Sequence, residues 1–254
     1  MKFKQDNNKK IAFLVVSCDK YSDLWAPFFT LLDKYWPNIN YKKYLLSNNK
    51  NFFWPGVNQI NIGEDISYSD NLLKCIDNID EEWILLWLED LFLSRPVNTA
   101  KLDRIISVFT KNESGYLKIA PDMPLSYTDD EIGELPKGIK YRSAIGATLY
   151  HKSTLRKLLS PGFSAWDIDK SNLSDSLSDP FYAFSPESSK DLPIEYINTL
   201  IRGKWSKPSI KFLKKEGFID ILENRDVESL YSWLYSVLYQ FRLSLFKYLR
   251  VHWR

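Results

Sequence analysis

The apolar residues of this chain are concentrated in two uninterrupted runs. The first is KIAFLVVSCD at Lys10 to Asp19, and the second is EEWILLWLEDLFLS at Glu81 to Ser94. Runs of this kind are typical of strands buried on both faces, as in the middle of a mostly parallel sheet. Shorter segments predicted as strands are Tyr41 to Ser47, Val57 to Ile62, Gly115 to Ala120, Tyr141 to Tyr150 and Phe181 to Phe184.

Apolar residues at helical spacing predict helices between these strands. Tyr21 to Trp36 carries an aromatic stripe, and Ser67 begins a second helix with Asp70 placed as in a capping box. Further helices are expected at Thr99 to Asn112 and from Ser153 to Leu159, whereas Asp122 to Gly138 has the composition of a mobile loop. The alternation predicts an α/β fold, a mixed and mostly parallel sheet flanked by helices.

Two acidic residues, Glu89 and Asp90, stand side by side within the second apolar run. An unpaired buried charge is costly, and open α/β sheets bind ligands just beyond the carboxyl ends of their strands. The pair therefore either faces a binding site at that edge or begins a solvated turn.

The last segment, Val227 to Arg254, is predicted as one amphipathic helix, which divides the chain into a domain at 1–224 and an appended helix at 225–254. It is uncharged from Ser229 to Phe241 and has no acids beyond that point. An aromatic apolar face beside basic residues suits an anionic membrane surface, and the alternative is packing on the core or on a partner chain. The basic residues are Arg242, Lys247, Arg250 and Arg254.

Bulk properties narrow the class of protein. The length of 254 residues fits one large α/β domain or one with a small appendage, and a net charge of +2 gives no nucleic-acid signature. Cys18 and Cys75 are read as buried thiols in a reducing compartment. The N-terminus has no signal-peptide pattern and no apolar run is long enough to span a bilayer, so a cytoplasmic location is expected.

The candidate chemistry rests on carboxylates. Only His151 and His252 are present, and no dinucleotide-binding or P-loop motif occurs. Clustered carboxylates suit Mg²⁺ or Mn²⁺ bridging to phosphate, one of them can act as a general base, and Arg202 with nearby lysines can neutralise a leaving diphosphate. The candidate acids near predicted strand ends and loops are Asp19, Asp65, Glu89, Asp90, Asp167 and Asp169.

Several short motifs together carry a family resemblance. LVVSCDKYSDLW, GEDISYSDNLL, LEDLFL, SAWDID and the later RGKW resemble the GT-A glycosyltransferases, and in particular bacterial enzymes of lipopolysaccharide and capsule assembly. The resemblance spans roughly Lys10 to Lys215. It implies a GT-A-like, Rossmann-like sheet and transfer of a sugar from a nucleotide-sugar donor to a hydroxyl of a lipid-linked glycan.

The resemblance also implies roles for individual residues. Asp90, with Glu89 beside it, would hold the divalent cation, and Asp167 or Asp169 would act as the base of an inverting reaction. Leu88 stands where the first acid of the family's acid-any-acid pattern would be, so metal dependence is open. Residues expected at the donor are Ser17, Asp19, Asp65, Glu89, Asp90, Arg202 and Lys204.

Two other readings compete with a glycosyltransferase at the membrane surface. One is a nucleotidyltransferase that makes the activated sugar, although Asp19-Lys20-Tyr21 stands where such enzymes have a Gly-rich basic loop. The other is a non-catalytic, membrane-associated scaffold with the same fold. Binding of sugar nucleotides distinguishes the scaffold from both enzymes.

Overall fold

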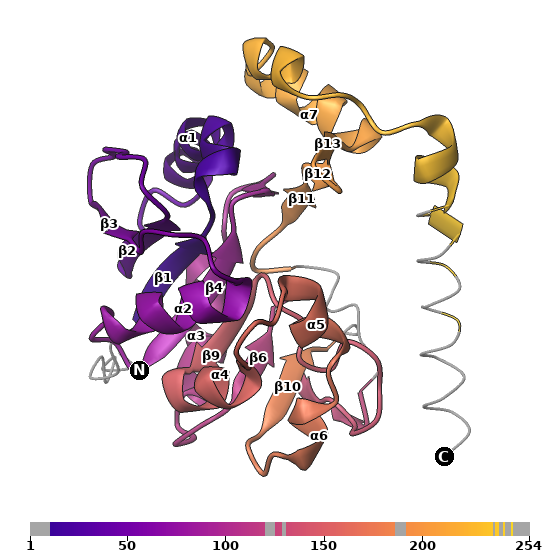
Figure 1. Ribbon diagram of the computed structural model, residues 1–254. Coiled ribbons are helices and arrows are strands. Elements are labelled where there is room, and N and C mark those ends of the chain that lie inside the picture. The colour runs from indigo at the N-terminus through magenta and orange to yellow at the C-terminus, as the bar shows by residue number, and fades with distance from the viewer. Residues whose placement is uncertain are drawn as a thin grey trace.

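The computed structural model describes residues 11–119, 125–128, 131–185, 192–235, 237–238, 241 and 245. Its centre is a sheet whose described strands number nine, in the order β3-β2-β1-β4-β9-β6-β10-β8-β7 (Figure 1). Their bounds are β1 (Ile11–Val16), β2 (Lys42–Ser47), β3 (Val57–Asn61), β4 (Trp83–Leu88), β6 (Tyr116–Lys118), β7 (Tyr127–Thr128), β8 (Ile132–Glu134), β9 (Thr148–His151) and β10 (Phe181–Phe184).

Most strands of this mixed sheet run in the same direction, as the sequence predicts. β3, β2, β1 and β4 pair in parallel, and β6 pairs in parallel with β10. β9 is inserted antiparallel between β4 and β6, so the carboxyl ends of all six parallel strands lie at one edge of the sheet. This edge is where an open α/β sheet binds its ligands.

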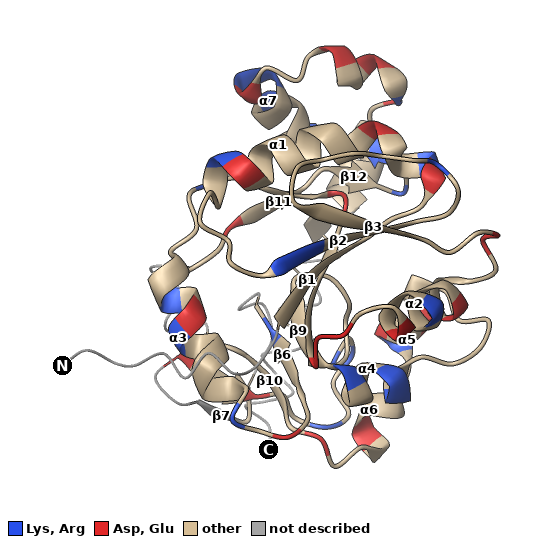
Figure 2. Ribbon diagram, turned by 90° about the vertical axis from the view of Figure 1, so that its left-hand side faces the viewer, with Lys and Arg blue, Asp and Glu red and all other residues tan. Residues whose placement is uncertain are grey.

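The two long apolar runs are buried on both faces because alternate residues enter two different cores. In β1, Phe13 and Val15 join one core while Leu14 joins the other. Helices α1 and α3 cover the first face, and α2, α4 and α5 cover the second (Figure 2). The helices are η1 (Asp19–Leu24), α1 (Trp25–Tyr35), α2 (Tyr68–Asp77), α3 (Thr99–Phe109), α4 (Lys152–Leu158), α5 (Ala165–Lys170), α6 (Leu173–Ser176), α7 (Lys207–Glu216) and η3 (Asp220–Asn224).

Two predicted segments differ from the structure. The predicted loop at 122–138 contains the β7–β8 hairpin, which pairs with β10 at the edge of the sheet. The predicted strand from Tyr141 is a strand only from Thr148, because Tyr141 and Ala147 have positive φ angles of 62° and 46° that an extended strand excludes. The helix predicted from Ser153 to Leu159 is α4, Lys152–Leu158, and the His151 side chain caps its start.

The late part of the chain folds back over the carboxyl edge. β11 (Tyr196–Asn198) pairs with β5 (Leu91–Leu93), and β12 (Leu200–Ile201) forms a hairpin with β13 (Lys204–Trp205). Backbone hydrogen bonds join Trp205 to Asp226 and Glu228. The residues just after the predicted boundary at 224 are therefore bonded to the β12–β13 hairpin. Of the predicted C-terminal helix, residues 230–235 are helical, and most of its remainder lies outside the described residues.

Candidate functional site

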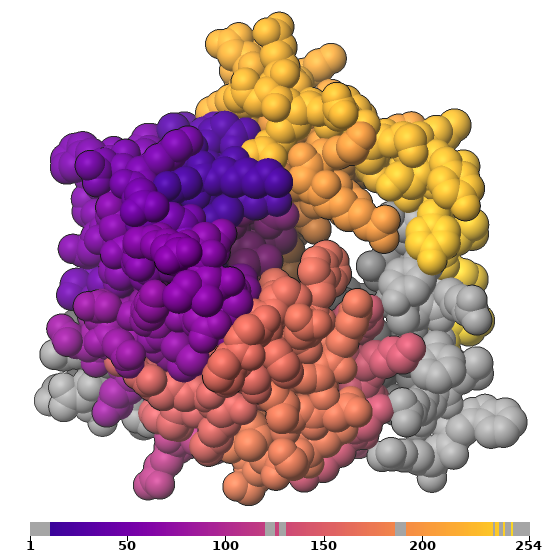
Figure 3. Space-filling model, in the orientation of Figure 1, coloured from indigo at the N-terminus to yellow at the C-terminus, as the bar shows by residue number. Residues whose placement is uncertain are grey.

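The order of the strands creates a switch point beside β1. The chain moves from β1 outward to β2 and β3, and then returns to place β4 on the other side of β1. In open α/β sheets the crevice beyond such a point is the usual ligand site. Figure 3 shows the surface hollowed where the N-terminal half, the segment containing α5 and the segment containing β11–β13 meet.

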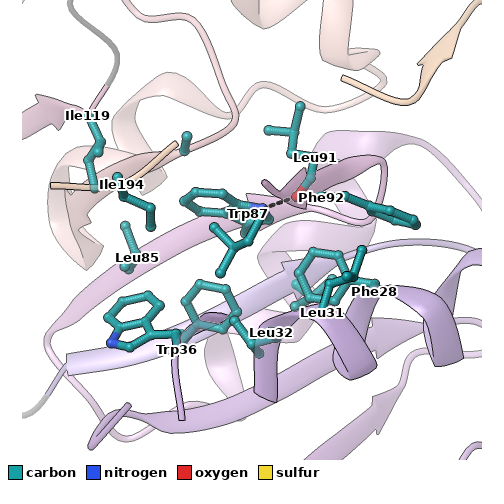
Figure 4. Close-up of a cluster of buried hydrophobic side chains, with 14 of the residues drawn as sticks. Phe28, Leu31, Leu32, Trp36, Leu85, Trp87, Leu91, Phe92, Ile119 and Ile194 are labelled. Atoms are coloured by element: carbon teal, nitrogen blue, oxygen red, sulfur yellow. Dashed lines mark hydrogen bonds between the residues drawn. The ribbon is translucent and has the colours of Figure 1, made fainter. Parts of the chain in front are cut away.

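Glu89 and Asp90 lie at this edge, in a tight turn between β4 and β5. The prediction of the edge position is confirmed, but the single strand predicted from Glu81 to Ser94 is wrong because the turn interrupts it. The Trp87 Nε1–H donates to the Leu91 carbonyl across the turn at 2.6 Å (Figure 4). Both the backbone N–H and the hydroxyl of Thr199 donate to the Asp90 carbonyl at 2.8 Å. The turn is therefore held on both sides.

The acids of this turn have unusual proton affinities. Burial, together with the charge of Asp90, raises the pKa of Glu89 well above its ordinary value. Burial also raises the pKa of Asp90 to about 6, against the opposing charge of Arg225. Two adjacent carboxyl groups with raised pKa values, set at a ligand-binding edge, are typical of a functional site.

Ser17 and Asp19 follow β1, and both are engaged by the protein itself. The Ser17 hydroxyl accepts a hydrogen bond from the Trp25 indole at 2.7 Å. The Asp19 carboxylate accepts bonds of 3.0–3.1 Å from three successive backbone N–H groups at 48–50. Asp19 does not cap η1 with its side chain, so its observed contacts fix the loop after β2 to the end of β1.

This anchoring gives a stability prediction for Asp19→Ala. Loss of the three bonds to a charged acceptor should lower the free energy of unfolding by about 2–3 kcal/mol, measured by urea denaturation. Asp65→Ala is the control, because the exposed Asp65 carboxylate accepts one bond, from the Asn71 amide at 2.5 Å. Equal unfolding midpoints for Asp19→Ala and the wild type would contradict the anchoring role.

Asp65 lies on the same edge as the acid turn. The charges of Glu89 and Asp65 both add to the effect of burial in raising the pKa of the Cys18 thiol. The thiol after β1 is thus near both carboxylates. Of the residues predicted at the donor, the structure brings Ser17, Asp19, Asp65, Glu89 and Asp90 to one edge.

The two late acids, Asp167 and Asp169, have different environments on α5. The exposed Asp167 carboxylate forms a capping box with Ser164, accepting from its backbone N–H at 2.9 Å and its hydroxyl at 2.6 Å. Asp169 is half-buried and accepts from the Ile145 backbone N–H at 2.8 Å. Burial raises the pKa of Asp169 to about 6, while the Ile145 bond and the charges of Lys118 and Lys170 oppose the rise.

Tyr68 connects Asp169 with the acid turn. Its hydroxyl is buried and has no hydrogen-bond partner among the described residues. Burial raises its pKa well above the ordinary value, and the charges of Tyr150, Asp169 and Glu89 add to the effect. The geometry places Asp169 at the same edge, because the Ile145 N–H that it accepts from is next to Gly146. A Cβ on Gly146 would lie 3.2–3.3 Å from the Leu91 and Leu88 side chains, which flank the acid turn.

Arg202 and Lys204 lie on the β12–β13 hairpin, with different surroundings. Arg202 is exposed and forms no ion pair within the described part of the chain. Lys204 pairs with Asp226 at 3.3 Å, which directs it toward the segment after η3. Of the two predicted cations, Arg202 is the one left available to a bound anion.

Sequence reasoning missed Tyr21, Thr199 and Arg225. The charges of Glu89 and Asp90 help to raise the pKa of Tyr21, behind the larger effect of burial. The Arg225 guanidinium lies over the Tyr21 ring, 4.8 Å from its centroid. Arg225 is about 200 positions away from Tyr21 in a stretch without a motif, so no local pattern could have indicated it.

The side chains available as metal ligands limit how a metal could bind. Within the described residues, no group of three or more His, Cys, Asp or Glu side chains is placed to hold a metal ion. Mg²⁺ at phosphate-transfer sites is typically held by one or two carboxylates, with water and substrate phosphates as the other ligands. The acid turn fits that smaller contribution, and Asp90 would be the residue to hold such an ion.

Comparisons with known proteins found similar folds only. No family model matches the sequence, and no curated protein matches it either. S. aureus TarS, in complex with UDP, aligns with a TM-score of 0.49 and 10% identity over 74% of this chain and 59% of its own. The galactosyltransferase LgtC, in complex with donor and acceptor sugar analogues, aligns with a TM-score of 0.42 and 9% identity over 86% of this chain and 98% of its own.

The bifunctional IspDF from Campylobacter jejuni aligns with a TM-score of 0.36 and 17% identity, over 63% of this chain and 46% of its own. The chain thus spans less than two thirds of the TarS and IspDF structures. With scores below 0.5, these likenesses do not establish an activity for the chain.

Proposed function

We propose that this protein is a glycosyltransferase that moves a sugar from a nucleotide-sugar donor to a hydroxyl group. The observation that carries the proposal is the placement of the Glu89–Asp90 turn at the switch point, on the same edge as Asp169. The turn suits the diphosphate side of a donor, and Asp169 suits the acceptor side. The family resemblance of the motifs supports the same reaction.

In the proposed reaction, Asp169 accepts the proton of the acceptor hydroxyl. At the same time the hydroxyl oxygen of the acceptor attacks the anomeric carbon in line. A carbon–oxygen bond forms to the acceptor, the bond from the anomeric carbon to the phosphate oxygen breaks, and the electron pair leaves with the nucleoside diphosphate. Arg202 neutralises the leaving diphosphate. A Mn²⁺ or Mg²⁺ ion held by Asp90 would stabilise the same charge when bound.

The acidity of Asp169 matches this role. A general base works best when its pKa lies near the working pH, and burial brings the pKa of Asp169 to about 6. Its Ile145 hydrogen bond fixes one carboxylate oxygen. Asp167, in contrast, is held in the capping box of α5.

Calorimetry with UDP, GDP, CDP, ADP and dTDP, each with and without Mn²⁺, tests the proposal. Binding of at least one diphosphate, followed by sugar release from the matching nucleotide sugar, is expected. Binding of none would favour the non-catalytic scaffold. Release of pyrophosphate from a nucleoside triphosphate and a sugar phosphate would favour the nucleotidyltransferase.

We further propose that the acceptor is a lipid-linked glycan of bacterial surface-polysaccharide synthesis, and that the C-terminal segment holds the protein on an anionic membrane surface. The Trp233 ring, which lies 5.8 Å from the Lys207 ammonium of α7, joins the start of this segment to the body. No helix among the described residues combines the length and hydropathy needed to cross a bilayer. The exposed apolar residues of the segment are Leu230, Tyr231, Leu234, Tyr235, Val237, Leu238, Phe241 and Leu245.

Membrane association predicts that Leu234→Ser with Leu238→Ser weakens binding to anionic vesicles. Each leucine contributes about 1.5–3 kcal/mol when fully buried, so the double variant should bind at least about tenfold more weakly. Co-sedimentation with phosphatidylglycerol vesicles measures the loss, and phosphatidylcholine vesicles should bind neither protein. Phe53→Ser is the control, because Phe53 is equally apolar and 86% exposed but lies on the β2–β3 loop. Unchanged sedimentation of the double variant would contradict the proposal.

A further inference from the structure

Arg225 joins three segments that are far apart in the sequence. Its guanidinium donates to both carboxylate oxygens of Asp23 in η1, at 2.9 Å and 2.5 Å, and to the Lys20 carbonyl at 3.2 Å. It also donates to the Gly203 carbonyl on the β12–β13 hairpin at 3.5 Å. The Arg225 side chain is only 11% exposed. A bidentate, nearly buried pair of this kind fixes geometry as well as adding stability.

The hairpin held by Arg225 presents Arg202 at its tip. Arg202 and Gly203 form a two-residue turn with φ angles of 51° and 78°, the left-handed conformation that such tight hairpins require. The Tyr21 hydroxyl lies 3.9 Å from the position that a Cβ on Gly203 would occupy. The tip is therefore packed beside η1, and its position depends on the contacts there.

The same contacts lie beside the acid turn. Thr199, one residue before β12, holds the Asp90 carbonyl with both of its donors. The ring of Tyr21 lies against Arg225. Burial raises the pKa of Tyr21, and the charges of Glu89 and Asp90 add to this rise. The hairpin is thus fixed to the acid turn at its base by Thr199 and to η1 at its tip by Arg225.

We propose that Arg225 is a positioning residue that holds the Arg202 tip of the hairpin against the diphosphate end of the donor site. The inference rests on the proposed function, because it assigns Arg202 to a bound diphosphate. Arg225 is engaged by the protein itself, since four hydrogen bonds from its five N–H groups go to Asp23, Lys20 and Gly203. Its contacts reach the donor through the hairpin, while its positive charge also favours the ionised forms of Glu89 and Asp90.

A double-mutant cycle in nucleotide affinity tests this role. The probe is whichever of UDP, GDP, CDP, ADP and dTDP binds the wild type most tightly by calorimetry. Arg202→Gln and Arg225→Gln should each weaken binding about tenfold, and the double variant should also lose about tenfold. A loss near a hundredfold in the double variant, or none in Arg225→Gln, would overturn the proposal, because the two residues would then act independently.

Controls separate positioning from stability. Glu216→Gln breaks a comparable link between α1 and α7, in which Glu216 pairs with Lys34 at 2.5 Å and accepts from the Tyr35 hydroxyl at 2.8 Å, and should leave affinity unchanged. If Arg225→Gln does not fold, Asp23→Asn is the second variant, because it weakens the same ion pair with Arg225 through its partner. It should show the same non-additivity with Arg202→Gln. If the wild type bound none of the five diphosphates, the proposed function would fail together with this inference. Tight wild-type binding with additive losses would overturn the inference alone.

Discussion

Asp169→Asn should lower the rate of sugar transfer by about 10²–10⁴-fold while nucleoside diphosphate binding stays unchanged. The amide keeps the shape of the carboxylate and can still accept from the Ile145 N–H, but it cannot take a proton from the acceptor. Because the proposed reaction assigns Asp169 to the acceptor, the donor should keep its contacts. Steady-state transfer and calorimetry on the same preparation measure the two effects.

The matched control for this substitution is Asp167→Asn, two positions earlier on α5. Its carboxylate serves the capping box with Ser164, so the change should weaken the start of α5 slightly and leave transfer largely intact. Loss of transfer in Asp167→Asn with full activity in Asp169→Asn would reverse the assignment of the base. Full activity in both variants would remove the base from α5 altogether.

The acidity of Asp169 adds a pH signature to the same experiment. Transfer needs Asp169 ionised, and with Mn²⁺ it also needs Asp90 ionised. Burial brings the pKa of each carboxyl group to about 6, so the wild-type rate should rise with pH and level off above about 6. Lys118 and Lys170 favour the ionised form. The pKa values of Tyr68 and Tyr150, which also face Asp169, are raised well above the ordinary range, so both remain neutral. An activity profile flat from pH 5 to 8 would contradict the role.

The folding stability should fall as the pH rises, whereas the transfer rate should increase. Because the folded-state pKa of Asp169 lies above the ordinary value of 3.8, the folded chain binds this proton more tightly than the unfolded chain. The resulting stabilisation is present below about pH 4 and lost as the pH rises through about 6. Asp169→Asn should therefore be more stable than the wild type at pH 7, by up to about 3 kcal/mol, and not at pH 4.

The central sheet could be predicted from the sequence because its signal is local. Strands such as β1 and β4 are buried on both faces by two cores, so every position is apolar and the run is unbroken. The helices between them show the apolar stripe of their covered face. The edge position of Glu89 and Asp90 follows from the end of one such run.

The parts that could not be predicted depend on contacts between distant segments. The strands β11, β12 and β13 are each only two or three residues long. β11 forms because it pairs with β5, about 100 positions earlier in the sequence. Arg225 is not part of any sequence motif, and its role depends on hydrogen bonds to the distant residues Asp23 and Gly203. Distinguishing Asp169 from Asp167 required the burial of one and the capping box of the other, and neither is visible in SAWDID.

Asp90→Asn should weaken nucleoside diphosphate binding at least about tenfold in the presence of Mn²⁺, and should abolish transfer. The reason is that the carboxylate of the acid turn is the protein's charged contribution to a cation shared with the diphosphate. Without Mn²⁺ the effect should reverse in sign, because removing a carboxylate from beside a diphosphate removes a repulsion. Calorimetric titrations of both proteins, with the metal and with a chelator, measure the pair of effects.

The control for this variant lies at the opposite end of the same strand. Glu81, just before β4, is a buried acid that accepts from the Tyr44 hydroxyl at 2.9 Å, far from the carboxyl edge. Glu81→Gln should leave diphosphate binding unchanged with and without Mn²⁺. If Asp90→Asn bound the diphosphate as tightly as the wild type in Mn²⁺, the cation would not depend on this turn. Arg202 would then carry the neutralisation of the leaving group, and transfer would continue in the presence of a chelator.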